Sequence, residues 1–516
     1  MIPIDVGRQL FVDDFLIQQT TMVRTQHQPV MYPLNPIVTP DALDIDSFAA
    51  PFSDGVWYDP ADQLFKMWFF CGGGPSKICY AYSADGKNWT RPSIPDAFVP
   101  NTDEVLENGL VVWMDLQDPN PAHKFKAFTV GSVPGTVIPY FSADGIHWSA
   151  GNQSQYPIPI EYDRTTLFWN PFRNVWVDSM KNYTTLPAVS SRPAYLTRLR
   201  NYSESPDLMN WSPLEPANFN TSFWTGPDSN DPPYVVGGTL PQLYNLDAVA
   251  YESVLVGLFS WYYPGNTDDN PNNLPGPDLV ELGVGFSRDG FQWVRSTRGS
   301  GPGPNGAFIP ASNISGTWNM GNTQSAGGCF LVVDDELWFY FSGRNGLHGD
   351  PSAVGATGLA TLRRDGFYSM DAGSSAAALT TRPVRFSGKY LFVNVQDPQG
   401  SLQIQVINPS NGAVLATSVP LSVDKTLQAV SWNGIADLSS FANQPVQFRF
   451  TLTSGKLYSF WVSASASGAS NGYVAANGPG FTGPIDNLGS AAYPTAVVTP
   501  EIYPVGGTVS SATNIT

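Results

Sequence analysis

The sequence predicts an all-β protein: a five-bladed β-propeller over residues 1–370, followed by a β-sandwich over residues 371–516. Three observations predict this fold class. A short turn motif recurs along the first two-thirds of the chain, and a pair of apolar runs precedes each copy. In addition, 48 Gly and 45 Pro are spread throughout. That composition is typical of many short strands joined by tight turns.

The turn motif reads Ser-x-Asp, three further residues, then Trp. In a tight turn between antiparallel strands, the Asp accepts backbone N–H groups and the Trp packs back under the blade. The motif resembles the Asp-box of sialidases. Its aspartates, Asp85, Asp144, Asp207 and Asp289, are expected to be structural because they lie in tight turns. The four complete copies and one degraded copy occupy residues 83–89, 142–148, 205–211, 287–293 and 364–367.

Each turn motif follows two apolar runs that are separated by a polar turn. The repeating unit is therefore strand A, turn, strand B, loop, strand C, Asp turn and strand D, which is the four-stranded blade of a propeller. The run at 7–12 is expected to supply the outer strand that closes the last blade. In chain order, the paired runs are 56–60 and 64–70, 110–115 and 125–129, 166–171 and 175–177, 248–252 and 254–261, and 329–334 and 337–341.

The pattern changes after about residue 371. Alternating apolar and polar residues at 390–395, 402–406 and 446–452 follow one another without Asp turns. This alternation predicts a β-sandwich. The last forty residues are polar and rich in Gly and Pro, and we expect them to wrap the surface.

Charge and composition exclude several classes of function. The net charge is −17, with only 26 Lys and Arg residues and no basic run. Binding to nucleic acid or to an anionic membrane is therefore not expected. No apolar stretch approaches the roughly 18 residues that a membrane-spanning helix needs. The cysteine spacings do not form a metal site, and no cofactor is expected.

Several features favour secretion. Cys71 and Cys79 flank a Gly-Gly-Gly-Pro loop between two strands, so a hairpin disulfide is expected, whereas Cys329 lies in an apolar run and is expected to be a buried thiol. Asn-x-Ser/Thr sequons mildly favour a secreted glycoprotein. The N-terminus has no charged segment followed by an apolar one, so the protein is either intracellular or has had a signal peptide removed, and the other features favour the second reading. The sequons begin at Asn88, Asn152, Asn182, Asn201, Asn210, Asn220, Asn313 and Asn514.

The blade pattern also sorts the carboxylates by face. In a propeller, the starts of strands A and the B–C loops share one face, whereas the A–B and C–D turns share the other. Ligands usually bind at the channel mouth, where the strands A converge. The carboxylates in the A–B turn register are therefore expected to be structural. They are Asp59, Asp115, Glu252 and Asp334.

Three carboxylates stand on the mouth face. Asp54, Asp163 and Asp247 lie five, seven and five residues before the A–B turn positions of blades 1, 3 and 4. These offsets are all odd, so in regular strands the three side chains point to the same side. Each aspartate could instead simply cap the entry of its strand. Their matching parity favours a shared site, with Asp46 at its rim.

This layout is similar to that of the five-bladed propeller glycosidases of glycoside hydrolase families 32 and 43, as a divergent relative. Residues 163–177 resemble the family 32 segment that begins Arg-Asp-Pro. The resemblance implies that Asp163 binds substrate hydroxyls, that Asp54 is the nucleophile or base, and that Asp247 takes the place of the general acid. The chain lacks the family's Trp-Met-Asn-Asp-Pro-Asn-Gly, Arg-Asp-Pro and Glu-Cys-Pro motifs.

The expected function is an exo-acting glycoside hydrolase that removes a terminal sugar, with a furanoside such as a fructoside or arabinoside favoured. Such a reaction needs two carboxyl groups across the scissile bond, one of them held protonated. An oligosaccharide or polysaccharide is then the expected substrate. Besides Asp46, the residues predicted to bind it are Trp57, Arg164, Arg344 and His348.

Two other functions fit the same pattern. A polysaccharide lyase would replace the acid pair by His and Arg chemistry, and Arg344 and His348 would then matter most. A carbohydrate-binding propeller without catalysis is the other alternative, because propellers host many unrelated functions.

Overall fold

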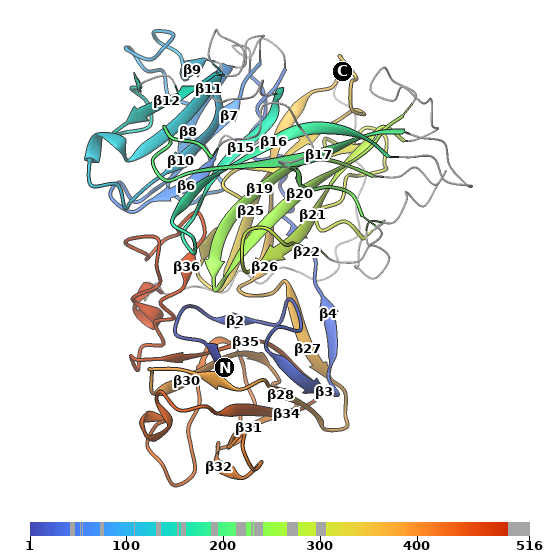
Figure 1. Cartoon of the computed structure of the whole chain (residues 1–516). Helices are drawn as coiled ribbons and strands as arrows, with labels where there is room; N and C mark the ends of the chain where they lie inside the picture. The colour runs from blue at the N-terminus through green and yellow to red at the C-terminus, as the bar shows by residue number, and fades with distance from the viewer. Residues whose placement is uncertain are drawn as a thin grey trace, which may run out of the picture.

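The computed structural model is all-β and forms two domains (Figure 1). It describes residues 1–41, 47–51, 53, 55–72, 77–107, 109–130, 136–151, 154–155, 161–186, 195–212, 223–228, 231, 241–265, 277–295 and 306–493. Within these residues the helices are short 3₁₀ turns at Pro121–His123, Ser439–Phe441 and Gly489–Ala492.

The larger domain is the five-bladed propeller that the repeat predicts. Each of the first four blades is an antiparallel sheet whose strands follow one another in chain order. Blade 1 contains β6 (Val56–Asp59), β7 (Leu64–Phe70), β8 (Lys77–Ser83) and β9 (Glu104–Glu107); blade 2 contains β10 (Gly109–Met114), β11 (Phe125–Val130), β12 (Thr136–Ser142), β13 (Ser149–Ala150) and β14 (Ser154–Gln155). Blade 3 contains β15 (Glu161–Asn170), β16 (Val175–Leu186), β17 (Tyr195–Ser205) and β18 (Phe223–Thr225); blade 4 contains β19 (Gln242–Glu252), β20 (Val254–Tyr263), β21 (Leu279–Ser287) and β22 (Val294–Arg295).

Blade 5 is closed by a strand from the N-terminal part of the chain. Its inner strand is split into β23 (Asn322–Ala326) and β24 (Leu331–Val333), both of which pair with β25 (Glu336–Arg344). β25 pairs with β26 (Gly355–Arg363), and β26 pairs with β5 (Val30–Met31).

The expectation that residues 7–12 close the last blade is wrong. β2 (Gln9–Leu10) pairs instead with β35 of the sandwich. The physical reason is Phe11, whose fully buried ring packs against Phe450 and Phe460 in the sandwich core.

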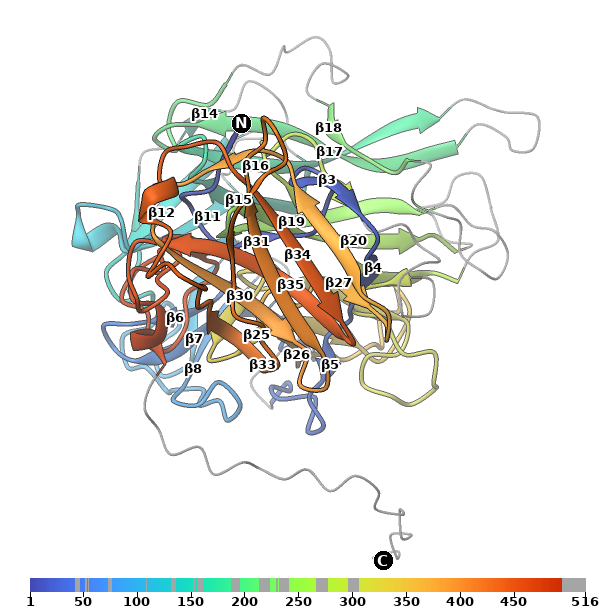
Figure 2. The same cartoon turned by 90° about the horizontal axis from the view of Figure 1, so that it is seen from below.

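The smaller domain is a sandwich of two sheets, seen in front of the blades in Figure 2. Its core is made by alternating strands: Leu402, Ile404 and Val406 are fully buried, whereas the residues between them are partly exposed. One sheet has the order β33 (Asp424–Ala429), β30 (Tyr390–Gln396), β35 (Gly455–Ser463), β27 (Tyr368–Ala372) and β4 (Val23–Gln26), with β2 also on β35; the other has the order β3 (Ile17–Thr20), β28 (Ala377–Thr381), β34 (Gln447–Thr453), β31 (Ser401–Ile407) and β32 (Val414–Thr417).

The domain boundaries differ from the expected ones at both ends of the chain. Residues 2–26 belong to the sandwich, where β1 (Ile2–Pro3) also pairs with β29 (Val384–Arg385). Near the other end, β36 (Tyr473–Val474) returns to the propeller and pairs with β19. Short strands of two to four residues give too weak a pattern in the sequence to reveal these crossings.

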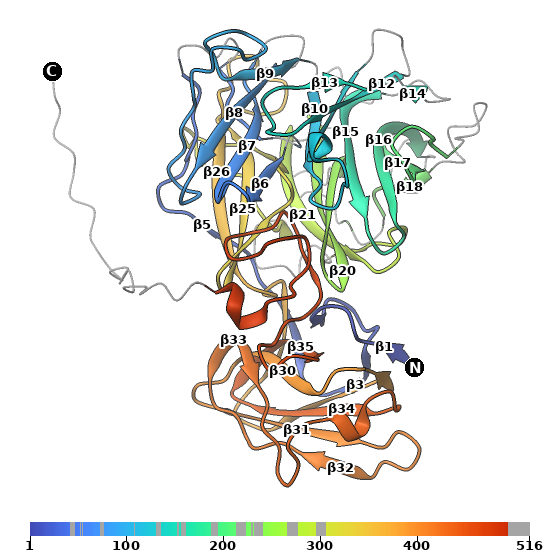
Figure 3. The same cartoon turned by 90° about the vertical axis from the view of Figure 1, so that its left-hand side faces the viewer.

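The segment that follows β36 lies between the two domains (Figure 3). Ala475 N donates to Ala250 O, and Val332 N donates to Asn477 O, so the segment hydrogen-bonds to inner strands of blades 4 and 5. It lines a cavity with Trp57 and Trp113 at this end of the channel. The last forty residues were expected to wrap the surface, but the described part of them packs beneath the propeller, between the two domains. Residues 494–516 lie outside the described part.

The turn aspartates are structural, as predicted. Asp85 Oδ1 accepts the backbone N–H groups of Lys87 and Asn88 at 2.9 and 2.8 Å. Asp144, Asp207 and Asp289 make the same pair of bonds in their own turns. Although partial burial acts in the opposite direction, these hydrogen bonds hold the pKa of Asp85 at about 2.

The expected disulfide between Cys71 and Cys79 is confirmed, and Cys329 is a buried free thiol. Replacing both bridged cysteines by serine is expected to lower the free energy of unfolding by about 2–3 kcal/mol, because the bridge closes a short loop in the unfolded chain. Urea unfolding with and without a reductant measures this. The reductant should destabilise the unmodified protein and leave the double variant unchanged. Equal unfolding midpoints for the unmodified protein and the double variant, both measured without reductant, would contradict the prediction.

None of the helices in the described part of the chain has the length and apolar character needed to cross a membrane. Within the same residues, no group of three or more His, Cys, Asp or Glu side chains is arranged to hold a metal ion.

Candidate active site

The inner strands of the five blades meet around the propeller axis. A cavity of about 20 Å³ lies there, and each blade contributes to its wall. The side chains involved include Trp57 from blade 1, Val112 from blade 2, Thr166 from blade 3, Asp247 from blade 4 and Cys329 from blade 5. Asp247 is thus a carboxyl group at the axis of an otherwise largely apolar channel.

Hydrogen bonds fix the side chain of Asp247. Ser53 Oγ donates to Asp247 Oδ1 at 2.6 Å. Asn245 Nδ2 lies 3.1 Å from each carboxylate oxygen and also contacts Ser325 Oγ at 2.9 Å. Asp247 is only 7% exposed, so its orientation is set by these neighbours and not by solvent.

Burial changes the acidity of this group. It raises the pKa of Asp247 to about 6, because removing the carboxylate from water disfavours its charged form. The hydrogen bonds from Ser53 and Asn245 and the positive charge of Arg164 act in the opposite direction and limit the rise. Asp247 therefore holds a proton at pH values where an exposed aspartate has lost it.

Arg164 and Asp163 lie on β15 of blade 3. The register of β15 with β16 shifts between Glu161 and Thr166, and Arg164 has a φ of 59°. The predicted parity of Asp163 assumed a regular strand, and this irregularity breaks the assumption. The backbone of Asp163 enters the blade on the mouth face, but its side chain lies outside the described part of the structure.

Arg344 and His348 reach the same face from blade 5. Arg344 ends β25, lies 4.9 Å from the ring centroid of Phe48, and has no hydrogen-bond partner on Nε. Burial lowers its pKa, and the nearby Arg164 lowers it further. The His348 ring lies 5.2 Å from that of Tyr244. The structure thus brings three of the predicted substrate-binding side chains to the face that carries Asp247.

Other predicted residues are placed differently. Trp57 is 3% exposed, donates through Nε1 to Val112 O at 3.1 Å, and packs edge-on against Trp113. Its ring is part of the channel core, which does not fit the predicted role in stacking on a sugar. Asp54 and Asp46 lie outside the described residues, so both stay predictions.

Glu252 lies at the opposite end of β19, as its register predicted. It is fully buried and accepts from Ser470 Oγ at 2.7 Å and from Arg364 Nη2 at 3.1 Å. Burial raises its pKa, and Arg8 and Arg364 oppose the rise. These contacts tie blade 4 to the sandwich side of the molecule, away from the channel mouth.

Sequence reasoning missed the residues that position Asp247. Asn245 lies two residues earlier on the same strand, so the period of two that selected Asp247 could also have selected its neighbour. Ser53 and Ser325 come from blades 1 and 5 and reach Asp247 and Asn245 only through the closure of the ring. The sequence carries no signal for contacts of that kind.

No protein-family model matches the chain, and no curated protein matches it. Similar solved structures include a glycoside hydrolase family 43 arabinoxylan arabinofuranohydrolase from Bacillus subtilis in complex with cellotetraose, 12% identical, with a TM-score of 0.35 over 84% of this chain and 99% of that chain. The family 32 β-fructofuranosidase of Bombyx mori is 11% identical, with a TM-score of 0.33 over 86% of this chain and 95% of that chain.

A β-fructofuranosidase from Schwanniomyces occidentalis, complexed with fructosyl-erythritol, is 12% identical, with a TM-score of 0.35 over 84% of this chain and 97% of that chain. Both families that the sequence resembles are therefore represented among the similar structures. At these identities the similarities assign no role to any residue of this chain.

Proposed function

We propose that this protein is a glycoside hydrolase in which Asp247 is the general acid. The observation that carries the proposal is the buried Asp247 carboxyl at the propeller axis, with a pKa of about 6. A carboxylic acid kept protonated near neutral pH can give its proton to the oxygen of a departing sugar. Arg164, Arg344 and His348 surround the same mouth and supply hydrogen-bond donors for sugar hydroxyls.

We also propose roles for the other two predicted carboxylates and a mode of action for the enzyme. Asp54 is the second carboxylate, acting as nucleophile or base, and Asp163 binds hydroxyls of the substrate. The enzyme removes one terminal sugar at a time, preferably a fructofuranoside or arabinofuranoside, and it works outside the cell. The Cys71–Cys79 disulfide supports the last point, since such bridges persist in oxidising compartments.

The test is an assay of the purified protein on a panel of furanosides and oligosaccharides across pH. Hydrolysis is expected to fall as the pH rises through about 6, because Asp247 loses the proton that it must donate. Unfolding measured over the same pH range separates this effect from a loss of folded protein. A flat pH profile for the folded enzyme, or no hydrolysis of any panel member, would contradict the proposal.

A lyase is the second candidate, because Arg344 and His348 of blade 5 both lie near Tyr244 of blade 4 and could act on one substrate. Lyase action produces an unsaturated sugar that absorbs in the ultraviolet, whereas hydrolysis does not. Appearance of that product, together with its loss on replacing His348 by alanine, would favour the lyase.

A further inference from the structure

The blades pack through their turn motifs in a repeated way. Trp68 Nε1 of blade 1 donates to Gly145 O in the turn of blade 2 at 2.7 Å, and Tyr340 Oη of blade 5 donates to Gly86 O in the turn of blade 1 at 2.8 Å. Trp224 of blade 3 donates to Gly290 O of blade 4 in the same manner. The turn of one blade thus contacts an aromatic donor of the blade before it.

These contacts depend on glycine. A Cβ placed on Gly145 would lie 2.2 Å from the Trp68 ring, and one on Gly86 would lie 2.5 Å from Tyr340 Oη. The corresponding residue in blade 3 is Leu208, with a φ of 67°. Its carbonyl accepts from Trp211 of its own turn, as the carbonyl of Gly86 accepts from Trp89. Leu208 lines the space between blades 2 and 3.

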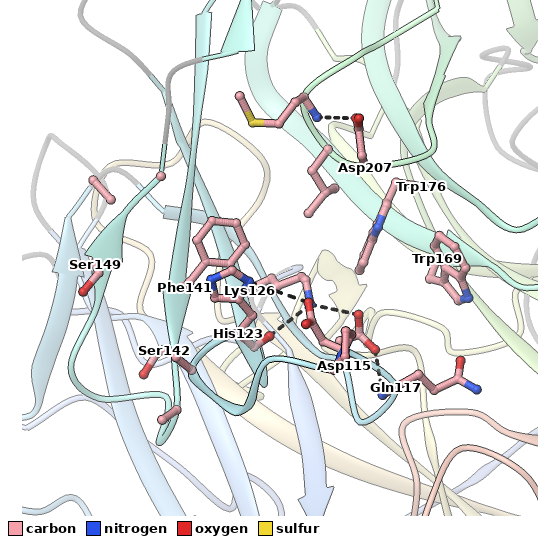
Figure 4. Close-up of a pocket in the computed structure, with 18 of the residues that line it drawn as sticks. Asp115, Gln117, His123, Lys126, Phe141, Ser142, Ser149, Trp169, Trp176 and Asp207 are labelled. Atoms are coloured by element: carbon pink, nitrogen blue, oxygen red, sulfur yellow. Dashed lines mark hydrogen bonds and ion pairs between the residues drawn. The ribbon is translucent and has the colours of Figure 1, made fainter.

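A groove opens between blades 2 and 3 at this place (Figure 4). Its volume is about 1110 Å³, and it lies on the face of the A–B and C–D turns, opposite the mouth that holds Asp247. Small-ligand pockets usually measure about 300–1,000 Å³. The groove therefore has room for several linked sugar rings.

The walls of the groove are aromatic. His123 stacks on Phe141 with ring centroids 4.1 Å apart and an interplanar angle of 23°. Across the groove, Trp169 packs against Trp176 at 5.3 Å. In Figure 4 these two ring pairs face each other from blades 2 and 3. His123, Phe141 and Trp169 are each partly exposed, so flat apolar ring surface is open to a ligand.

The floor between the walls is polar. Lys126 Nζ donates to Asp115 Oδ2 at 2.8 Å and to Asp118 Oδ2 at 2.7 Å, and the exposed Gln117 lies beside them. The two carboxylates retain lone pairs for further hydrogen bonds. Since Lys126 is already neutralised and the whole chain carries a charge of −17, an anionic ligand is disfavoured.

Aromatic faces beside carboxylate and amide acceptors match the chemistry of a sugar ring, which has apolar C–H faces and hydroxyl edges. We propose that the groove between blades 2 and 3 is a second carbohydrate-binding site, which holds a neutral stretch of the polysaccharide whose end is cleaved at Asp247. This inference rests on the proposed function for the identity of the ligand. A second site on one enzyme raises the effective concentration of a long chain and does nothing for a short one.

The test replaces Ala143, an exposed residue on the groove wall, by arginine. Ala84 is its exposed counterpart in the turn of blade 1, outside the groove, so Ala84→Arg is the matched control. Both changes are made in an Asp247→Asn background, so that the ligand is not consumed. Affinity electrophoresis in gels that contain inulin or arabinan measures binding. Ala143→Arg is expected to raise Kd about tenfold, and Ala84→Arg is expected to leave it unchanged.

A second variant, His123→Ala, removes the exposed ring without adding charge and should weaken binding in the same gels. With Asp247 intact, Ala143→Arg should reduce the hydrolysis of the polymer and leave that of a disaccharide unchanged. Unchanged binding in both variants overturns the groove proposal even if the enzyme hydrolyses sugars. Binding that depends on the groove, without any hydrolysis, supports the groove and overturns the proposed function. Absence of binding to both polysaccharides by the parent Asp247→Asn protein also overturns the groove proposal.

Discussion

Replacing Asp247 by asparagine is expected to lower kcat/KM on a natural glycoside by about 10²–10⁴-fold, the usual contribution of a general acid. The change is nearly isosteric, so the channel core should keep its packing. Asn245 Oδ1 has no hydrogen-bond partner, so its amide can turn over and accept from the new side-chain amide. The loss should therefore reflect the missing proton and not a disrupted fold. Thermal unfolding of the variant checks this point.

The leaving group provides a sharper readout. A sugar alkoxide needs a proton as it departs, whereas a nitrophenolate leaves readily without one. The Asp247→Asn variant should therefore lose much less activity on a nitrophenyl glycoside than on an oligosaccharide, and the fall in activity near pH 6 should disappear. Equal losses on both substrates would contradict the role of general acid.

Glu252→Gln is the control for this experiment. Glu252 is the other buried carboxyl group of β19 and shares the raised pKa, but it lies at the far end of the strand. Its replacement should destabilise the protein and leave the kcat of the folded fraction unchanged. A loss of kcat in Glu252→Gln but not in Asp247→Asn would indicate that Glu252, and not Asp247, is the general acid.

Replacing Arg364 by methionine is expected to lower the free energy of unfolding by about 3–5 kcal/mol, because it leaves buried carboxylates without their cation. Arg364 is fully buried; its Nη2 lies 3.1 Å from Glu252 Oε1 and 3.2 Å from Asp486 Oδ2, and its Nη1 donates to Tyr493 Oη. Removing one partner of a buried ion pair costs more than the pair itself contributes.

Arg8 completes this interface network. Its Nη1 donates to Asp365 Oδ2 at 3.0 Å and to Thr426 O at 2.9 Å, and its guanidinium lies 4.2 Å from the Trp461 ring centroid. Residues of blade 4, blade 5, the sandwich and the C-terminal segment therefore share one set of buried charges. The Arg364→Met change should weaken the coupling between the domains as well as the global stability.

Urea unfolding, followed by tryptophan fluorescence, measures the effect of Arg364→Met. Arg385→Met is the control, since the Arg385 side chain is exposed and such changes usually alter stability by less than about 0.5 kcal/mol. An equally small effect for both variants would show that the network contributes nothing measurable. Separate transitions for the two domains in Arg364→Met alone would show that the network couples them.

The sequence predicted the propeller because each blade repeats the same local chemistry. The motif aspartates bind their own turns, and no distant residue is needed to recognise them. The degraded fifth copy differs, because its residues bind distant parts of the chain. In this copy, Arg364 and Asp365 bind Arg8, Glu252 and the sandwich, and only the folded chain reveals these partners.

The site was predictable only in part. The period of two along a strand selected Asp247, and the blade pattern brought Arg164, Arg344 and His348 to the same face. The strand irregularity at Arg164 and the hydrogen bond from Ser53 to Asp247 were not predicted. The Ser53 contact joins blades 1 and 4 across the ring, and no short window of the sequence contains both residues.

The crossing of the chain between its two domains also constrains the order in which the protein can fold. During synthesis, β1 and β2 emerge first, yet their partners β29 and β35 lie more than 350 residues later in the chain. β5 likewise cannot pair, and the ring cannot close, until β26 has been synthesised. Blades 1 to 4 can form while the ribosome is still at work, since their strands pair in chain order. The ring can close once β26 has been made, which ends at residue 363, whereas the sandwich also needs β35, which ends at residue 463. A chain cut at residue 370 would leave its first 26 residues without the sheets that they complete.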